Sequence, residues 1–294
     1  GKEQVRKARQ TLAKYKEGKA VLDKRIVSNE QWWKLRHWGE IGCDKDDTRP
    51  MPASAWLFNS LANKHADAMD NIPEPTVLPR EKSDEEVAKQ LSLILPAILE
   101  RCGYEKLYSD GWWYKLKNGS MCTAVVWDPD ADGGMGDIAI RNADILNLFW
   151  EPGIKDIEES ANLFYVTLVD RERLNLMYPE LLGEDTESVA GGTGNVEKYK
   201  TEDKTDDSAK VEVIDWYYKK TINGRKQLCY CKFCGDRVIY SSEDDESCAD
   251  GFYKHSRYPF VMDTLFVQEG TPCGFGYIDV MRDAQMYIDK LSQV

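Results

Sequence analysis

The chain has 294 residues, of which 42% are hydrophobic and 31% charged, and it carries a net charge of −12 at pH 7. No apolar run approaches the ~18 residues of a transmembrane helix, and residues 1–30 are too charged for a secretory signal, so we expect no membrane as a partner. Residues 39–294 carry a charge of −19, and so acidic a surface repels a phosphate backbone, which excludes simple DNA binding through it.

The N-terminal segment has the opposite charge. Residues 1–38 hold eleven Lys and Arg against four Asp and Glu, a local charge of +7. Apolar residues at helical spacing predict a helix over residues 2–26. The basic side chains could contact nucleic acid or an acidic neighbour, although a solvated helix face is the simpler interpretation. We treat residues 1–52 as a basic helical arm.

Tryptophans are concentrated in the next part of the chain. Trp32, Trp33 and Trp38 lie within seven positions of one another, a density that favours docking onto a surface. A second helix is predicted over residues 54–70 from its apolar spacing. The prolines of residues 72–80 then force an extended passage.

The following segment combines a helix signal with a helix breaker. Ser83 and Glu86 form a capping-box pattern that opens a helix, and Pro96 predicts a kink or break within it. Residues 104–140 are interpreted as rich in strands. Within them, alternating apolar residues over 122–127 and again from Ile138 predict two strands joined by an acidic, glycine-rich turn.

The C-terminal half alternates strands with polar segments. A strand is predicted over residues 163–169, and residues 183–210 are so polar that we expect a mobile insertion. Asn223-Gly224 is a hairpin signal of good quality. A final helix begins near Tyr277 and is still running at Val294, so we expect the chain to be a fragment of a longer protein.

Several phrases of this sequence resemble the portal (head-to-tail connector) proteins of tailed bacteriophages. They are VVWDPDADGGMGDI, beginning at Val125, and LFWEPGI, beginning at Leu148. SAWLFNSLANKHADAMDNIPEP precedes them, and YPFVMDTLFVQEG and GFGYIDVMRDAQMYIDKL follow them, all in the family's order. The resemblance covers most of residues 50–294.

The resemblance implies an α+β fold with a mixed, largely antiparallel sheet and packed helices. It implies a wing-like domain over residues 53–276 and the beginning of a stem-directed helix over 277–294. The expected function is that of a structural subunit in a portal ring, expected to have twelve subunits, through which double-stranded DNA is packaged and ejected. The partners would be other copies of the chain, terminase, scaffold or capsid proteins, and head-completion proteins. The location would be the virion, and the host cytoplasm during assembly.

The acidic turn is also a candidate calcium site. Asp128, Asp130, Asp132 and Gly133 match positions 1, 3, 5 and 6 of a calcium-binding loop. Position 12 should be a bidentate Glu, and here it is Ala139. A hairpin turn explains the same residues, because Asp favours turn starts and glycine permits positive φ.

A cysteine-rich segment supplies a second metal candidate. A tetrahedral zinc site needs four thiolate or imidazole ligands, and the segment contains a C-x-x-C pair with further ligands nearby. The candidates are Cys229, Cys231, Cys234, Cys248 and His255. The alternative function is therefore a zinc-binding nucleic-acid-interaction module centred on residues 229–255. Against it, the chain has eight cysteines without a secretory signal, which indicates ordinary thiols of a reducing compartment.

No pattern indicates catalysis, and we expect the protein to be neither an enzyme nor dependent on a cofactor. None of His37, His65 and His255 lies next to a nucleophile motif. The aromatic clusters could stack single-stranded bases, but they have few basic neighbours, so core or subunit-interface packing is favoured. The interface candidates are Trp32, Trp33, Trp38, Trp112 and Trp113.

Overall fold

The computed structural model describes residues 2–42, 48–179, 199, 210–222 and 224–294. The mobile insertion predicted over 183–210 therefore lies almost entirely outside the described residues. The chain divides into two compact units. Unit 1 comprises residues 1–30, 144–258 and 268–272, and unit 2 comprises residues 31–143, 259–267 and 273–294. Each unit is made of several separate segments of the chain, whereas the predicted domains were consecutive stretches of sequence. The division into those predicted domains remains a prediction.

Unit 1 is built on an antiparallel sheet of five strands. Their order in the sheet is β3-β4-β5-β6-β7. The strands are β3 (Leu148–Phe149), β4 (Asn162–Asp170), β5 (Lys210–Ile222), β6 (Arg225–Cys234) and β7 (Arg237–Ser241). The strand predicted over 163–169 and the hairpin predicted at Asn223-Gly224 are confirmed by β4 and by the β5–β6 pair.

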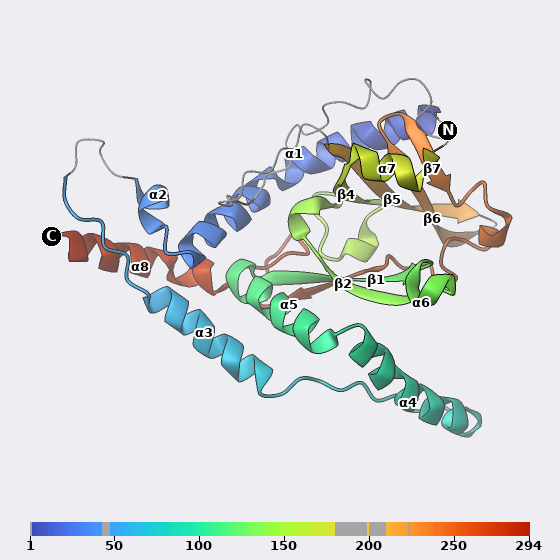
Figure 1. The fold of residues 1–294 in the computed structure, drawn as a ribbon, viewed down its shortest axis with the longest axis horizontal. Coiled ribbons are helices and arrows are strands. Elements are labelled where there is room, and N and C mark those ends of the chain that lie inside the picture. Colours follow the sequence, from blue (N-terminus) through green and yellow to red (C-terminus); the bar gives the residue numbers. More distant parts are fainter. Residues whose placement is uncertain (1, 43–47, 180–198, 200–209, 223) are drawn as a thin grey trace. The chain divides into compact units, whose positions relative to one another are not determined.

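Helix α1 (Lys2–Trp33) covers one face of this sheet with its N-terminal part. The helix predicted over residues 2–26 is confirmed and continues for seven further residues. Figure 1 shows the N-terminal part of α1 lying along the strands. Its buried stripe contacts aromatic side chains of these strands. The stripe consists of Val5, Ala8, Leu12 and Tyr15. Each large apolar side chain buried in this way contributes roughly 1.5–3 kcal/mol to folding.

The opposite face of the sheet packs against helix α7 (Arg171–Met177). Leu174 of this helix lies in one buried cluster with Val211, Val213 and Cys234. Three 3₁₀ turns complete the described helices of unit 1. They are η2 (Ile145–Asn147), η3 (Ile157–Glu159) and η6 (Glu246–Cys248).

Unit 2 contains an antiparallel three-stranded sheet with β1 in its centre. The strands are β2 (Asp137–Ala143), β1 (Ser120–Asp128) and β8 (Phe260–Thr264). Strands β1 and β2 form the predicted hairpin, in which Trp127 is paired with Ile138. The turn between them includes the short helix α6 (Ala131–Gly134), where Asp132 and Gly133 both have positive φ.

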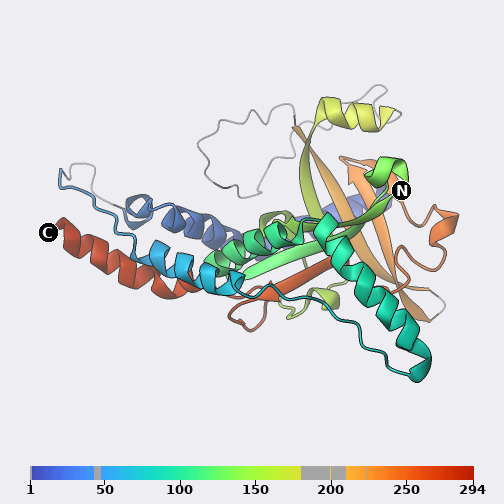
Figure 2. The same ribbon diagram turned by 60° about the horizontal axis from the view of Figure 1, so that its bottom comes forward.

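A layer of helices completes unit 2 (Figure 2). The helices are α2 (His37–Ile41), α3 (Trp56–Met69), the 3₁₀ turn η1 (Lys82–Asp84), α4 (Glu85–Arg101), α5 (Tyr104–Asn118) and α8 (Tyr277–Gln293). Helices α3, α5 and α8 share one apolar core. Its fully buried members are Trp32, Leu57, Leu61, Leu116 and Ile278. No helix in the described ranges has the length and hydropathy of a membrane span.

One local prediction was wrong. Residues 104–118 form helix α5 and not strands, because the left-handed glycines Gly103 and Gly119 bound a helical segment whose Leu116 enters the core. Of the kink or break predicted at Pro96, the break is absent, since α4 continues through Pro96 to Arg101. Aromatic residues favour strands by propensity, but here burial against α3 and α8 decides the structure. The α+β class, with antiparallel sheets and a C-terminal helix, is confirmed.

Candidate functional site

The three aspartates of the acidic turn do not converge. Asp128 forms an ion pair with Arg141 on the neighbouring strand, and its other oxygen accepts a hydrogen bond from the backbone N–H of Asp130 at 3.2 Å. Asp132 occupies a left-handed backbone position with φ 50°. In the described part of the chain, no group of three or more potential ligands is placed to hold a metal ion. The arrangement is that of a hairpin turn.

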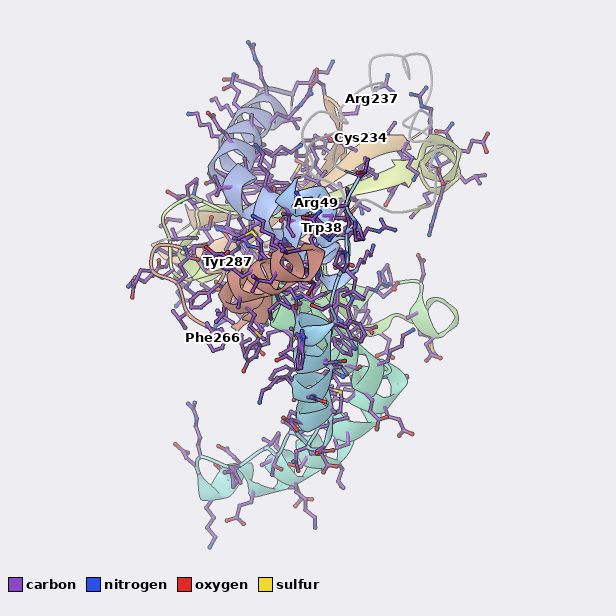
Figure 3. The ribbon with its side chains drawn as sticks, turned by 90° about the vertical axis from the view of Figure 1, so that its left-hand side faces the viewer. Trp38, Arg49, Cys234, Arg237, Phe266 and Tyr287 are labelled. Carbon is purple, nitrogen blue, oxygen red and sulfur yellow. The ribbon has the colours of Figure 1, made fainter. Side chains whose placement is uncertain are left out.

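The zinc candidates of strand β6 lie on opposite faces of the sheet. Cys229 and Cys231 are buried under α1, whereas Cys234 belongs to the cluster beneath α7. Figure 3 shows Cys234 near Arg237, its partner in the β6–β7 register. Burial raises the pKa of both the Cys231 and the Cys234 thiol to about 11. Zinc binds thiolates, so these residues are better suited to core packing than to a metal site.

The two remaining zinc candidates have other partners. Cys248 lies 3.7 Å from the hydroxyl oxygen of Tyr240. The Nδ1 atom of His255 accepts a hydrogen bond from the backbone N–H of Arg257 at 3.1 Å, and its ring stacks on Tyr253. The structure therefore does not bring the predicted zinc ligands together.

Three of the five tryptophans proposed as interface residues build the core of unit 2. Trp32 is buried and is part of the cluster shared by α3, α5 and α8. Trp33 stacks on Phe58 with ring centroids 4.6 Å apart and contacts Trp113 at 5.0 Å. Trp113 in turn stacks on His65 at 3.8 Å. Their aromatic surface is largely used within the subunit.

The other two tryptophans, Trp38 and Trp112, are half-buried like Trp33 and Trp113, and Trp112 also packs against the core of unit 2. The indole N–H of Trp38 donates to the carbonyl oxygen of Pro52 at 2.8 Å. The ammonium of Lys115 lies 4.6 Å from the centre of the Trp112 ring and also pairs with Asp263. Assignment of all five tryptophans to a subunit interface stays a prediction.

A buried His–Asp pair connects the helices of unit 2. The Nδ1 atom of His37 lies 2.5 Å from Oδ2 of Asp289, and both side chains are fully buried. The Nε2 atom of His37 lies 3.0 Å from the carbonyl oxygen of Trp32, which can only accept. Oδ1 of Asp289 accepts from the backbone N–H of Ser54, from its hydroxyl, and from Gln285.

These contacts set the charge of the carboxylate. Burial opposes ionisation of Asp289, but hydrogen bonds from Ser54, His37 and Gln285 outweigh it and hold the pKa of Asp289 below its ordinary value. The pair ties the end of α1 and helix α2 to α8 and to Ser54, two residues before α3. Since neither side chain is exposed, the pair has no access to a substrate and acts as a structural lock.

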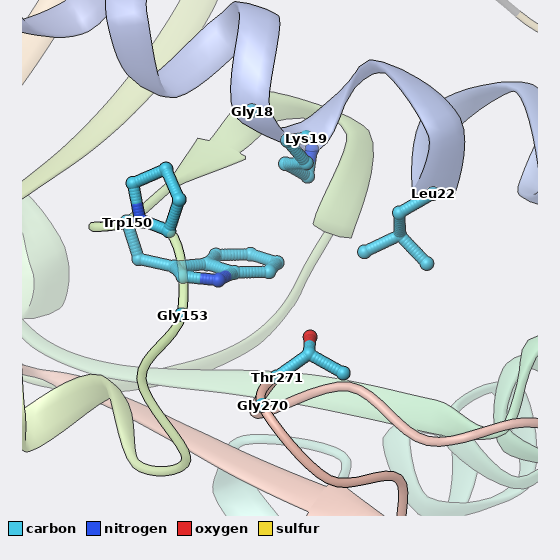
Figure 4. Close-up of a pocket in the computed structure, with 8 residues that line it drawn as sticks. Gly18, Lys19, Leu22, Trp150, Gly153, Gly270 and Thr271 are labelled. Atoms are coloured by element: carbon cyan, nitrogen blue, oxygen red, sulfur yellow. The ribbon is translucent and has the colours of Figure 1, made fainter.

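A small pocket of about 100 Å³ lies within unit 1 (Figure 4). Lys19 lines it, but its ammonium donates to the carbonyl oxygen of Ile145 at 2.6 Å and pairs with Asp23 at 2.7 Å. Gly18 allows the helix to approach Pro152, since a Cβ there would lie 2.5 Å from the proline ring. The charged group of the pocket thus holds α1 against η2.

In the described residues, the buried polar clusters connect elements of the fold. Residues 66–250 match the family model of phage P22-like portal proteins. Because this match covers more than half of the chain, the protein belongs to the phage P22-like portal protein family. The matched range contains the acidic turn and the Leu148–Ile154 phrase, so the family predicted from those phrases is confirmed. A search of curated protein sequences finds no match.

Proposed function

We propose that this protein is a subunit of the portal ring at one vertex of a phage capsid, and that double-stranded DNA passes through this ring during packaging and ejection. The observation that carries the proposal is the portal-family match over residues 66–250, which makes a structural role in a bacteriophage particle the starting point. We expect twelve subunits in the ring.

The charge of the chain supports a role as a conduit. DNA must be able to move through the channel, so tight contacts between protein and phosphates would be unfavourable. Such contacts require clusters of Lys and Arg. The chain carries −12 overall, so most of its surface repels the DNA backbone. Weak contact between the protein and DNA would allow the DNA to slide through the ring.

The proposal includes docking of the packaging motor and of head-completion proteins on the ring, as well as contact with scaffold or capsid protein. The ring would assemble in the host cytoplasm and remain in the virion. It also includes the absence of catalytic activity. In support, His37 is buried in the structural lock, and His65 stacks on Trp113 with its Nε2 3.2 Å from the carbonyl oxygen of Ser109.

An assembly experiment tests this function. Phage heads would be assembled with and without this protein, and their DNA content measured after nuclease treatment. We expect DNA-filled heads only when the protein is present. Heads that package DNA equally well without it would contradict the proposal.

A further inference from the structure

Helix α4 carries an apolar stripe that the rest of the subunit leaves uncovered. Val87, Leu91 and Ile94 follow at intervals of four and three residues, so they lie on one side of the helix, and all three are exposed. Another side of α4 faces the extended strap before it, where the Ser92 hydroxyl bonds the backbone N–H and carbonyl of Val77. We call Val87, Leu91 and Ile94 the α4 stripe. Figure 2 shows α4 and the strap running side by side away from α5.

A second uncovered apolar surface lies on the sheet of unit 2. Alternate residues of β1, together with their partners on β2 and β8, point to one face of a sheet. The exposed apolar side chains on this face are Val125, Trp127, Ile138 and Val261. Helix α5 covers the same face near Met121 and Asn142: a Cβ on Gly111 would lie 2.6 Å from the methionine sulfur, and the Asn142 amide donates to the carbonyl oxygen of Leu107. We call the exposed part the Trp127 face.

Trp127 is held in place for binding. Its side chain is 56% exposed, but one edge of the indole lies against Gly136, where a Cβ would come within 2.5 Å of the ring. Gly136 has φ +80°, so the tight turn that supports the ring requires glycine at this position. A large aromatic side chain fixed before binding loses little entropy on contact, which is typical of residues that dominate interfaces.

Charge restricts what can cover these surfaces. Copies with a net charge of −12 repel each other, so close approach is favoured where at least one of the two contacting surfaces carries no acidic residue. Residues 87–99 contain no acidic residue and one basic residue, Lys89. The Trp127 face is bordered by the aspartates of the acidic turn, which disfavour an acidic partner. The α4 stripe is therefore electrostatically compatible with the Trp127 face.

The two surfaces also differ in shape, one being a helix ridge and the other a sheet face. A contact between unlike surfaces repeats head to tail and can close into a ring, whereas a contact between identical surfaces stops at a dimer. We propose that the α4 stripe of one subunit binds the Trp127 face of a second copy of this chain. This inference rests on the proposed ring and names one of its subunit contacts.

Substitutions of exposed side chains test the contact in the full chain. Ile94→Glu places a charge in the stripe, and Trp127→Lys removes the aromatic anchor. The matched controls are Leu93→Glu, on the adjacent position of α4 and more exposed than Ile94 (71% against 51%), and Val267→Lys, on an exposed loop of unit 2. Loss of an interface anchor weakens association by about 30-fold or more. In sedimentation velocity, Ile94→Glu and Trp127→Lys should associate more weakly than wild type by this factor. The controls Leu93→Glu and Val267→Lys should assemble as wild type does.

Mixing the two interface variants tests the head-to-tail geometry. The Ile94→Glu chain keeps an intact Trp127 face, and the Trp127→Lys chain keeps an intact α4 stripe. A one-to-one mixture should therefore form a discrete heterodimer held by one intact contact, although neither variant assembles alone at that concentration. Normal rings from Ile94→Glu would overturn the inference and assign the stripe to another protein. Assembly of Trp127→Lys alone would overturn the sheet face as the binding surface.

A disulfide experiment provides a test that does not depend on weakened assembly. A chain with both Ile94→Cys and Trp127→Cys should form a ladder of covalent multimers on oxidation, beyond that of either single variant. A crosslink confined to monomers would overturn the contact between copies. If the full-length wild-type protein is monomeric at all concentrations, the ring itself fails; if it forms rings and its double-cysteine variant gives no ladder, only this contact fails.

Discussion

Replacement of Asp289 separates the contributions of the buried lock in unit 2. Asp289→Ala leaves the Ser54 N–H and hydroxyl, Gln285 and His37 without their common acceptor in a buried site. Removing a buried carboxylate that accepts several hydrogen bonds leaves its donors unpaired and costs about 3–5 kcal/mol of unfolding free energy. We expect this loss for Asp289→Ala, measured by urea unfolding with tryptophan fluorescence, since Trp32 stacks on His37 at 4.6 Å.

Asp289→Asn should cost less, about 1–2 kcal/mol. Its amide oxygen can still accept from Ser54 and Gln285, and its N–H₂ can donate to Nδ1 of a neutral His37, which keeps the Nε2 proton for the Trp32 carbonyl. Asp283→Asn, at an exposed position of the same helix, serves as the control. An Asp289→Ala variant within 0.5 kcal/mol of wild type, or an Asn variant as unstable as the Ala variant, would refute this reasoning.

The same lock predicts a pH dependence. The folded pKa of Asp289 lies below its ordinary value of 3.8, so the folded protein binds this proton less readily than the unfolded chain. The stabilisation is therefore fully present above about pH 4 and lost as the pH falls through the folded pKa. Unfolding free energies measured between pH 7 and pH 3 should fall more steeply for wild type than for Asp289→Asn, and equal slopes would contradict this assignment.

Three further predictions concern single positions. Gly119→Ala should destabilise unit 2 by more than about 2 kcal/mol in urea unfolding, because Gly119 has φ +86° and the new Cβ would lie 2.2 Å from the Phe275 backbone. The control Gly133→Ala, which has open space around its new Cβ, should cost about 1 kcal/mol. Equal costs for the two variants would contradict the packing argument. Cys231→Ser should leave the metal content of the purified protein unchanged, and loss of one zinc per chain would revive the zinc-site interpretation. Lys19→Met should cost about 2–3 kcal/mol in unit 1, because the Ile145 carbonyl loses a charged donor; an unchanged unfolding midpoint would refute that role.

Local patterns predicted those elements that local interactions determine. The alternation over residues 122–140 gave the β1–β2 hairpin, and the apolar spacing of residues 2–26 gave most of α1. Residues 104–118 were misassigned because their aromatic composition favours strands, while the burial that makes them helical depends on distant segments. Likewise, Pro96 as a local signal indicated a kink or a break, whereas α4 continues through it to Arg101.

Contacts between distant residues could not be predicted in the same way. His37 and Asp289 are separated by 252 positions, and neither lies in a motif, so no sequence signal indicated the lock. For the cysteines of β6, by contrast, the sequence does indicate which face of the strand each one occupies. Cys229 and Cys231 differ by an even number of positions from each other and by an odd number from Cys234, which places Cys234 on the other face of a strand. Applying that parity rule would have separated the zinc candidates.

The central claim is that this portal-family chain forms a ring through which DNA passes. Electron microscopy of the full-length protein tests it most directly. We predict rings of a single symmetry with a central opening wide enough for duplex DNA. Particles that remain monomers or closed dimers without a channel, at concentrations where they are folded, would contradict the claim.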